Sequence, residues 1–536
     1  MHRREFIQLT TALTGASLLP LSCSTTRKIP GTIVGASAKT GHLIRDGRLM
    51  QSVPVSTEQT DILIIGAGIS GLSAARSLHR QGHTDMVILE MESHAGGNAS
   101  SGSNAINAYP WGAHYVPIAN TNLAEYLAFL QENEVITGYT PAGLPIYNEL
   151  YLCSDPQERL YINGSWQEGL VPSLGVGAED RQQIDRFLQQ MQLFREARGN
   201  DAKEAFAIPV DASSKDPHYT RFDTITMHQW MQEQQYTSDY LRWYIDYCTR
   251  DDFGTGISEV SAWAGIHYFA CRKGKAGNAA SQDVLTWPQG NGWLASRLSK
   301  DIQHCLRPHT MATRLIPGTD SVTVHYYDVT AGTLKAITAK TCIVAIPQLI
   351  AARLLPDSTD RLQLLHRHYQ YSPWLVANIT VKDLAERSGA SPSWDNVLYN
   401  SPSLGYVDAT QQQLQQLKPR RVLTYYRPML TDGTVEERKK AQQRSHEQWV
   451  NMIIDDLRIV HPDIEKQTEQ IDIMLWGHAM AQPRPQLIHG GIREQLQASL
   501  YNRVHFAHTD LAGVSIFEEA FYQGIEAAQK ARQSLS

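Results

Sequence analysis

Two short apolar runs near the start of the chain flank a segment whose apolar residues repeat at helical spacing. The runs, residues 61–65 and 86–89, are continuous rather than alternating, which is typical of strands buried on both faces of a parallel sheet. Between them, Leu72, Ala75 and Leu78 fall on one face of a helix that reaches as far as Gly82. The order of these elements predicts a strand–helix–strand unit of an α/β fold.

The end of the chain carries a comparable pattern. Residues 504–510 predict a strand that leads to Asp510, and a helix follows. Its packed face is marked by Phe517, Ala520, Phe521, Gly524, Ala527, Ala528 and Ala531. Ser515 and Glu518 match the S-x-x-E capping box, which predicts the start of this helix.

The turn between the first strand and its helix has the glycine spacing of a dinucleotide site. It consists of Gly66, Ala67, Gly68, Ile69, Ser70 and Gly71. The first glycine permits a tight turn, the second lets the backbone approach a pyrophosphate, and the third lets the helix pack close to the strand. Unpaired N–H groups at the helix start attract the phosphates. Glu90, which ends the second strand, can accept hydrogen bonds from ribose hydroxyls, and it disfavours NADP.

Composition and charge exclude several classes of function. The 536 residues suit two or three domains, and no run of 18 apolar residues follows the N-terminus, so we expect no transmembrane helix in the mature protein. The net charge is −6 with acids and bases interspersed, which argues against a nucleic-acid-binding surface. The six cysteines contain no CxxC pair, so neither a zinc site nor a disulfide framework is expected.

A second glycine motif follows Glu90. Gly96 and Gly97 come six and seven residues after this acid, and Asn98 follows them. An acid followed by a Gly-Gly pair resembles the GG-doublet flavoproteins, which include flavin-containing amine oxidases, L-amino-acid oxidases and phytoene-desaturase-like enzymes. The resemblance implies FAD as the cofactor, with the doublet close to its phosphates. That family usually has arginine after the doublet and a base two residues after the acid, whereas this chain has Asn98 and Glu92.

Further segments follow in the order of that family. Residues 110–115 resemble the glycine segment beside the flavin, 287–294 the glycine turn before a helix, and 341–347 the strand that ends in a proline. The resemblance implies cofactor contacts from Gly112, Ala113, His114, Tyr115, Ala312, Asp510, Ser515, Ile516 and Phe517. In this assignment, Ala312 starts the strand beside the adenine and Asp510 binds the ribityl chain. The helix start after Ser515 faces the pyrimidine end of the flavin, where it stabilises the negative charge of the reduced form.

The resemblance covers residues 59 to 536 and predicts an α/β fold. A discontinuous Rossmann-type FAD-binding domain is expected to carry an inserted α+β substrate domain. The expected FAD-binding segments are residues 58–116, 283–356 and 487–536, and the expected substrate segments are residues 117–282 and 357–486.

The N-terminus resembles a twin-arginine (Tat) export signal. Arg3 and Arg4 precede a mild apolar stretch at residues 9–21, in the order of a charged region followed by an apolar one. Residues 1–23 are therefore the expected signal peptide, and residues 24–57 the expected spacer. The resemblance implies the Tat machinery as a partner and a periplasmic location. This route carries folded proteins, as a noncovalent flavin requires. A lipid anchor at Cys23 is the less favoured alternative, because Pro20 replaces an expected aliphatic residue.

Candidate catalytic residues are few. Amine oxidases of this family often carry a lysine near the flavin. Counting back from Lys382 along the strand at residues 374–382 places Asn378, or a residue next to it, there instead. No aromatic sandwich is predicted, and His478 stands where a caging aromatic residue is expected. His478 is the one candidate acid–base group. Residues 250–256, rich in turn formers and charges, predict a solvent loop, with a loop of the site as the alternative.

Three functions stay open at this point. The first is FAD-dependent oxidation of a C–N bond in an amine or amino acid, in the periplasm, with hydride transfer to the flavin. The second is a flavin desaturase, dehydrogenase or isomerase that acts on a C–C bond of an apolar substrate. The third is a flavin-binding protein without turnover that serves a partner complex.

Overall fold

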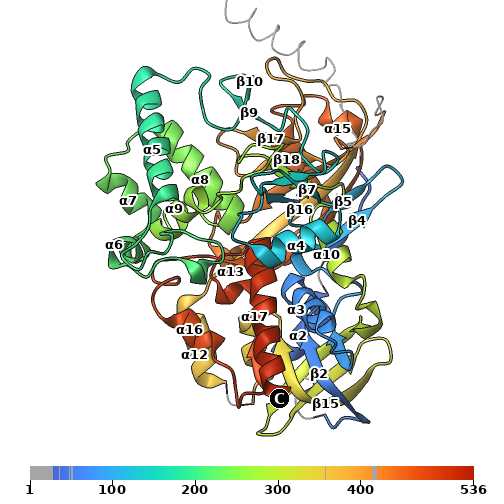
Figure 1. The fold of residues 1–536 in the computed structure, drawn as a ribbon. Coiled ribbons are helices and arrows are strands. Elements are labelled where there is room, and N and C mark those ends of the chain that lie inside the picture. The colour runs from blue at the N-terminus through green and yellow to red at the C-terminus, as the bar shows by residue number, and fades with distance from the viewer. Residues whose placement is uncertain are drawn as a thin grey trace, which may run out of the picture.

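Two large sheets organise the part of the chain that the structure describes (Figure 1). The structure is a computed structural model, and it describes residues 28–35, 37–47, 49, 52–356, 358–412 and 419–535. The expected signal peptide at residues 1–23, with its twin arginines and Cys23, lies outside these ranges. Export through the Tat machinery and the lipid anchor therefore stay predictions.

A seven-stranded sheet occupies the lower half of Figure 1. Its strands lie in the order β12 (Leu306–Arg307), β3 (Met86–Leu89), β2 (Thr57–Ile65), β15 (Thr333–Val344), β14 (Val322–Asp328) and β13 (Thr310–Pro317), with β21 (Val504–Phe506) also paired to β15. Pairing is parallel from β12 to β15 and with β21, and antiparallel from β15 to β13. Separate stretches of chain supply these strands, so the predicted discontinuous Rossmann-type α/β fold is confirmed.

Helices cover both faces of this sheet. Successive residues of β2 point to opposite sides, so each face contributes its own apolar side chains to the packing. Ile62 and Ile64 are buried in one apolar cluster, and Leu63 and Ile65 in another. The first cluster contains residues of α3 (Ile69–Arg80), α4 (Ala124–Glu132), α10 (Gly292–Ser299) and α17 (Phe517–Leu535). The second contains residues of α11 (Gln348–Leu354), α12 (Thr359–His368) and α16 (Ile492–Gln497). The continuous apolar run of β2 thus reflects burial on both faces.

An eight-stranded mixed sheet lies in the upper half of Figure 1. Its order is β1 (Ile33–Gly35), β20 (Thr468–Ala481), β16 (Tyr371–Val381), β19 (Arg421–Pro428), β18 (Gly405–Asp408), β17 (Asp395–Leu398), β9 (Glu158–Ile162) and β10 (Ser165–Glu168). The helices α13 (Thr434–Gln443), α14 (His446–Leu457) and α15 (Ile464–Gln467) accompany this sheet. Leu375 and Ala377 of β16 pack with Trp449 of α14, while Trp374 and Val376 point to the opposite side. That opposite side faces the cavity described below.

A helical layer stands beside the eight-stranded sheet, at the upper left of Figure 1. It consists of α5 (Ala178–Glu196), α6 (Pro217–Thr220), α7 (Met227–Glu233), α8 (Asp239–Phe253) and α9 (Ala262–Ala270), most of which share one apolar cluster. Three two-stranded antiparallel sheets complete the described strands: β6 (Tyr115–Pro117) with β11 (Val284–Thr286), β4 (Ser101–Ser103) with β5 (Ala108–Pro110), and β7 (Ile136–Tyr139) with β8 (Pro145–Tyr147). No helix in the described ranges is long and apolar enough to cross a membrane.

The segment expected to be a spacer needs correction. It contains β1, which extends the eight-stranded sheet, and the helix α2 (Ala38–Arg45). Ile29, just before β1, is 5% exposed and belongs to the apolar cluster around Trp449. The sequence pattern missed this because a three-residue edge strand and a two-turn helix have too few residues to show a periodicity.

Candidate active site

The first glycine turn has the geometry expected of a dinucleotide site. Gly66 lies in the left-handed region at φ +97°, and a Cβ on Gly71 would lie 1.9 Å from the carbonyl oxygen of Gly66. Glycine is therefore required at both positions for the turn and for close helix–strand packing. A Cβ on Gly68, in contrast, would meet nothing within 4 Å. Open space thus faces Gly68 at the start of α3, where helix N–H groups lack intrahelical partners.

The second glycine motif packs directly on the first. The N–H of Gly96 donates to the carbonyl of Ala67 at 2.8 Å, and a Cβ on Gly97 would lie 3.3 Å from the Cα of Gly68. Ile69, Ser70 and Gly71 form the first turn of α3, as predicted. The structure therefore brings the two motifs together at one helix start.

Glu90 lies at the end of β3 on the same edge. Its carboxylate accepts hydrogen bonds from the N–H groups of Ala67 and Glu92, both at 2.8 Å. Its carbonyl accepts from the N–H of Thr310 at 2.8 Å, so the start of β13, with Ala312, lies beside it. Burial raises the pKa of Glu90. The ribose and adenine contacts assigned to Glu90 and Ala312 stay predictions, but the two positions are neighbours in space.

A cavity of about 150 Å³ begins beside the second glycine motif, where Asn98 lines it, and reaches the eight-stranded sheet at Trp374, Val376 and Tyr426. Its walls come from segments far apart in the chain. They are Asn98, Gly112, Ala113, His114, Tyr115, Pro117, Asp251, Asp252, Arg272, Asn291, Trp374, Val376, Tyr426, Trp476, Ala479, Met480, Ser515, Ile516, Phe517 and Glu518. Residues assigned to the flavin from both ends of the sequence therefore line one cavity.

Backbone approach shapes one side of the cavity. A Cβ on Gly112 would lie 2.2 Å from the carbonyl oxygen of Asn98, and the Ala113 N–H donates to that oxygen at 2.9 Å. The Gly112 carbonyl accepts from the Tyr426 hydroxyl at 3.0 Å. The side-chain amide of Asn98 donates to the carbonyl of Ala479. This loop is thus fixed by contacts from β19 and β20 of the eight-stranded sheet.

Three buried polar atoms of the cavity lining have no hydrogen-bond partner within the described structure. They are the hydroxyl of Ser515, the side-chain oxygen of Asn291 and the indole nitrogen of Trp374. Such atoms cost free energy unless a ligand or water satisfies them. Together with the open space at Gly68, they fit a bound dinucleotide whose flavin reaches the start of α17.

The capping box predicted at Ser515 is not formed. The helix α17 begins at Phe517, and the Ser515 hydroxyl has no partner in the described structure. Glu518 is 2% exposed and lines the cavity, so its side chain does not turn back to cap the helix from solvent. The pattern predicted the position of the helix but not the direction of these two side chains.

Asp510 is buried at the end of the β21 segment, 1% exposed. Its carboxylate accepts hydrogen bonds from the Gln348 N–H at 2.8 Å and the Tyr371 hydroxyl at 2.7 Å, and it contacts His508 at 3.2 Å. Burial raises its pKa, but His508 and these bonds outweigh burial and hold the pKa below its ordinary value. A carboxylate has about four acceptor positions. The predicted ribityl contact is therefore compatible with the bonds present.

Carboxyl groups dominate the charged lining of the cavity. Asp251 and Asp252 lie in the last turn of α8, and Arg272 pairs with Asp252 at 2.6 Å. The Tyr115 hydroxyl donates to Asp251 at 3.4 Å. Burial and, to a smaller extent, the adjacent Asp252 raise the pKa of Asp251 to about 7. Burial also raises the pKa of Glu518 to about 7.

The end of α8 is anchored by residues remote in sequence. Gly254 ends the helix at φ +61°, and its carbonyl accepts from the Ser372 hydroxyl, which in turn accepts from the Gln482 amide at 2.8 Å. A Cβ on Gly254 would lie 2.7 Å from the side chains of Ser372 and Trp374. The expectation of a solvent loop at residues 250–256 is therefore wrong. Asp251 and Asp252 line the candidate cavity, as a loop of the site would, but they belong to the last turn of α8 and not to a loop. In the sequence, turn-forming residues at a helix end look like a surface loop, because the remote residues that bury them, here Ser372 and Gln482, cannot be recognised.

Aromatic rings form another wall. Trp374, Tyr426 and Trp476 line the cavity, and the ring of His114 stacks on Tyr426 at 4.4 Å between centroids. Burial lowers the pKa of His114 to about 4, so its ring is neutral near pH 7. The sequence indicated no aromatic sandwich, because the rings come from strands that become neighbours only after folding.

Both predicted catalytic residues lie outside the cavity lining. The Asn378 amide donates to the Pro110 carbonyl at 3.0 Å and accepts from the Thr424 hydroxyl at 2.7 Å, so its bonds are structural. The residues of β16 that line the cavity are Trp374 and Val376. His478 contacts the ring of Tyr371 at 5.7 Å, and its neighbours Trp476, Ala479 and Met480 line the cavity in its place. Asn378 lies on the same face of β16 as Trp374 and Val376 but two residues farther along the strand, where Pro110 and Thr424 use its side chain.

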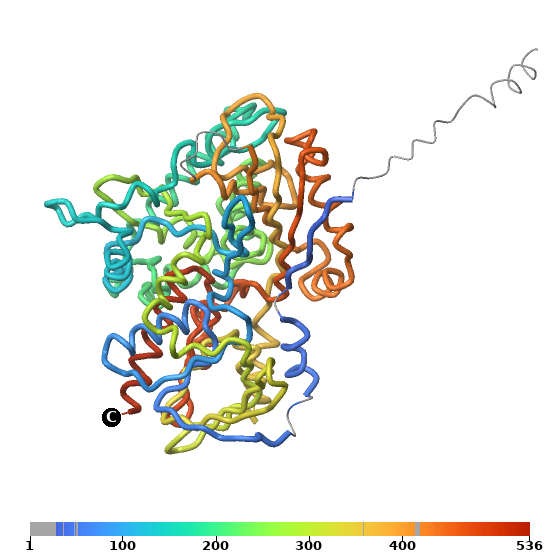
Figure 2. Tube along the Cα trace, turned by 90° about the vertical axis from the view of Figure 1, so that its right-hand side faces the viewer, coloured from blue at the N-terminus to red at the C-terminus, as the bar shows by residue number. Residues whose placement is uncertain are grey.

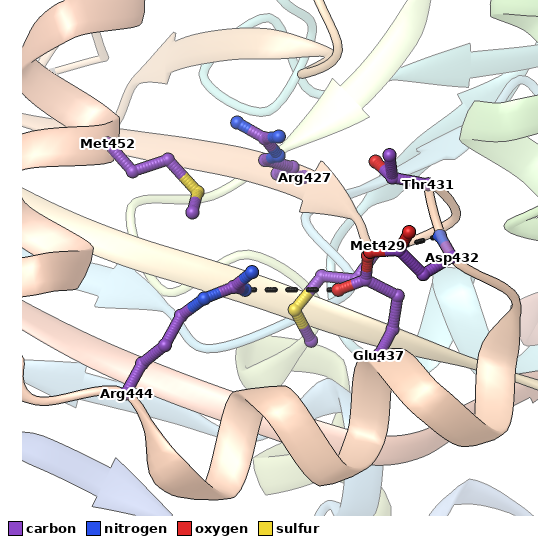
Figure 3. Close-up of a pocket in the computed structure, with 7 residues that line it drawn as sticks. All are labelled: Arg427, Met429, Thr431, Asp432, Glu437, Arg444 and Met452. Atoms are coloured by element: carbon purple, nitrogen blue, oxygen red, sulfur yellow. Dashed lines mark hydrogen bonds and ion pairs between the residues drawn. The ribbon is translucent and has the colours of Figure 1, made fainter.

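A second cavity, of about 190 Å³, lies among β19, α13 and α14 (Figure 3). Its lining consists of Arg427, Met429, Thr431, Asp432, Glu437, Arg444 and Met452. Glu437 accepts from the Asp432 N–H at 3.3 Å and pairs with Arg444 at 3.8 Å. None of the described motif residues lines it, so the first cavity is the candidate site.

The buried acids at the start of α17 predict how stability depends on pH. Burial raises the pKa of Glu518 to about 7 and that of Glu519 to about 8, against about 4.3 in an unfolded chain. Between those values the folded state binds more protons, so stability falls as pH rises, by up to about 1.4 kcal/mol per pH unit for each group. We expect a lower midpoint of thermal unfolding at pH 7.5 than at pH 5.5 for the flavin-free protein. Glu519→Gln should weaken this dependence, and a midpoint that rises over the same interval would contradict it.

Comparisons with known proteins agree with this architecture. A family model described as an NAD(P)-binding Rossmann-like domain matches residues 64–130. The fold is similar to putrescine oxidase bound to putrescine, with a TM-score of 0.64 and 15% identity over 88% of this chain and 99% of that one. It is also similar to cyclohexylamine oxidase from Brevibacterium oxydans, with a TM-score of 0.62 and 15% identity over 89% and 98%.

A CLA-producing fatty acid isomerase from P. acnes is a further match. Its TM-score is 0.62 and its identity 15%, over 87% of this chain and 97% of that one. Amine oxidases and an isomerase therefore share this architecture, and the similarity does not separate their reactions. The chain has the α/β Rossmann-like FAD-binding fold with an additional mixed sheet, as in the amine oxidases.

Proposed function

We propose that this protein is an FAD-dependent oxidoreductase that oxidises a C–N bond of a small amine. The observation that carries the proposal is the excess of carboxyl groups in the cavity. Asp251, Asp252 and Glu518 line it, while Arg272 is the one Arg or Lys among its described lining residues and is engaged by Asp252. A cationic ammonium group fits such a lining better than an anionic substrate does.

The residues present fit FAD along the whole path. Glu90 and the start of β13 would hold the adenosine end, and the start of α3 with Gly96 and Gly97 the pyrophosphate. Gly112 to Tyr115 and the start of α17 would hold the flavin. When bound, FAD supplies the acceptor for the hydride equivalent.

The protein's part in the reaction begins with a proton. An aliphatic ammonium has a pKa near that of lysine, about 10.4, and it must lose a proton before a hydride can leave the adjacent carbon. Asp251, with a pKa of about 7, is ionised in part near neutral pH and can accept that proton. The Tyr115 hydroxyl, which donates to Asp251, holds the carboxylate in place.

The surrounding rings orient the substrate and exclude water. Trp374, Tyr426 and Trp476 line the cavity with aromatic rings. The electron-rich face of such a ring attracts an ammonium group, and its apolar surface excludes water. The names of the similar oxidases, which refer to putrescine and cyclohexylamine, support an amine as the substrate class. Amino acids fit less well, because Arg272, the natural partner for a carboxylate, is paired with Asp252.

Location forms a second part of the proposal. The twin arginines near the N-terminus support export through the Tat machinery to the periplasm, after the flavin is loaded. Export of a reporter fused to residues 1–57 that stops when Arg3 and Arg4 become lysines would support this. Export that survives the change would exclude it.

The decisive test is an anaerobic titration of the purified protein with amines, diamines and amino acids. We expect a yellow protein whose flavin absorbance bleaches with one class of amine. A flavin that no amine reduces would overturn the proposal in favour of C–C chemistry or a partner protein without turnover. Bleaching by an unsaturated or apolar substrate would distinguish the first of these from the second.

A further inference from the structure

The N-terminal part of the described chain connects the two large sheets. We call residues 29–35 and 37–46, which contain β1 and α2, the strap. Figure 2 shows its course from the upper half of the molecule down to the seven-stranded sheet. Specific contacts hold the strap at each end, which a simple linker between a signal peptide and a domain would not need.

At its first end the strap is fixed to the eight-stranded sheet. β1 pairs in parallel with β20, with Ile33 opposite Ile473. The N–H and hydroxyl of Thr32 both donate to the Asp472 carboxylate, at 3.0 and 2.9 Å. Gly31 lies so close to the Ile471 carbonyl oxygen that a Cβ would approach it to 1.7 Å. Main-chain pairing, a charged side chain and a steric requirement for glycine all hold this end.

At its second end the strap is fixed to Glu92. The N–H and hydroxyl of Ser37, which begins α2, both donate to the Glu92 carboxylate at 2.8 Å. A carboxylate at a helix start also interacts favourably with the helix dipole. Glu92 stands where the GG-doublet family usually has a base. The acid at this position therefore has a physical role, which is to hold the strap.

The contact lies beside the expected adenosine site. The N–H of Glu92 donates to the Glu90 carboxylate at 2.8 Å, so one residue binds the strap through its side chain and orients Glu90 through its backbone. The helix α2 contacts β13 and α11, Ile44 packs against the apolar cluster of that side, and Gly41 lies against Met91. Together these contacts place α2 at the edge formed by β3 and β13.

We propose that the strap closes the adenosine end of the dinucleotide site and slows the escape of FAD. This inference rests on the proposed function, because it requires that FAD binds. The strap is held at one end by β20 and at the other by Glu92, so α2 cannot leave this edge unless the contact with Glu92 breaks. The GG-doublet family usually has basic residues at the positions of Asn98 and Glu92. Retention of FAD by the strap would compensate for the missing positive charge near the phosphates.

The test is the rate at which FAD leaves the purified holoprotein. Released flavin is followed by its fluorescence after dilution into buffer with an excess of a flavin-binding scavenger protein. Ser37→Ala and Glu92→Gln are expected to increase the dissociation rate about tenfold, the effect of losing one charge-assisted hydrogen bond. The double variant should be no faster than the faster single variant by more than about twofold, because both changes break one contact. Lys39→Gln, an exposed position on the same helix, is the matched control and should leave the rate unchanged.

Hydrogen exchange gives a second measurement that needs no turnover. Backbone amides of residues 38–45 should exchange more slowly with FAD bound than without it, and this difference should disappear in Glu92→Gln. Equal dissociation rates in the wild type, Ser37→Ala and Glu92→Gln, in a protein that binds FAD, would overturn the strap and leave the proposed function intact. A wild-type protein that binds no FAD would overturn both.

Discussion

Replacement of Asp251 by asparagine is expected to lower kcat/KM for the reactive amine by about 100-fold at pH 7. Asparagine has the same shape and can keep the contact with Tyr115, but it cannot accept a proton from an ammonium group. General-base catalysis contributes about 10²- to 10⁴-fold in comparable enzymes. The measurement is the rate of flavin reduction at several amine concentrations under anaerobic conditions, which separates binding from the chemical step.

The pH dependence of the same rate is an independent test of Asp251 as the general base. Burial raises the pKa of Asp251 to about 7, so the carboxyl is protonated below that pH and cannot act as a base. The wild-type kcat/KM should therefore rise with pH up to about 7, and this rise should be lost in Asp251→Asn.

The control is Asp239→Asn, at the exposed start of the same helix α8. Its rate and pH profile should match those of the wild type. A wild-type rate in Asp251→Asn would show that another group takes the proton. Glu518, which lines the same cavity with a pKa of about 7, is then the next candidate.

The cofactor side of this molecule could be predicted from sequence because local sterics determine it. Gly66 needs a positive φ, and Gly71 must lie against the Gly66 carbonyl, so the glycines leave a fixed spacing in the chain. The strands around them are buried on both faces and appear as continuous apolar runs. The start of α17 was located by the apolar periodicity of its packed face, which is also a local signal.

The substrate side could not be predicted in the same way because long-range contacts determine it. Asp251 faces the cavity only because the end of α8 is held by Ser372 and Gln482, each more than 100 residues away. A count along one strand placed Asn378 on the correct face of β16, but the chain segment at Pro110, remote in sequence, packs over it, and only Trp374 and Val376 of that face line the cavity. In the sequence, Glu92 appears only as the absence of a basic residue. The structure shows that its carboxylate binds Ser37, which is 55 residues away along the chain.

Substitutions at two glycines of the same turn are expected to have opposite consequences. Gly68→Val should weaken FAD binding by at least about 100-fold, equivalent to about 2.7 kcal/mol, while the flavin-free protein stays folded. A Cβ at this position meets nothing within 4 Å, and the backbone at φ −71° and ψ −179° is extended, which suits valine. The added methyl groups would fill the space through which a pyrophosphate approaches the helix start.

Gly71→Ala should act on the fold itself. Its Cβ would lie 1.9 Å from the Gly66 carbonyl oxygen, a backbone atom that cannot move without opening the turn. Overpacking of this kind costs about 1–3 kcal/mol or more. We therefore expect a lower midpoint of thermal unfolding in Gly71→Ala without FAD, and a midpoint within about 2 °C of the wild type in Gly68→Val. Calorimetry of the flavin-free variants and titration with FAD measure the two effects separately. If Gly68→Val bound FAD as tightly as the wild type, the dinucleotide could not lie against Gly68, and the path from Glu90 to the start of α17 would have to be abandoned.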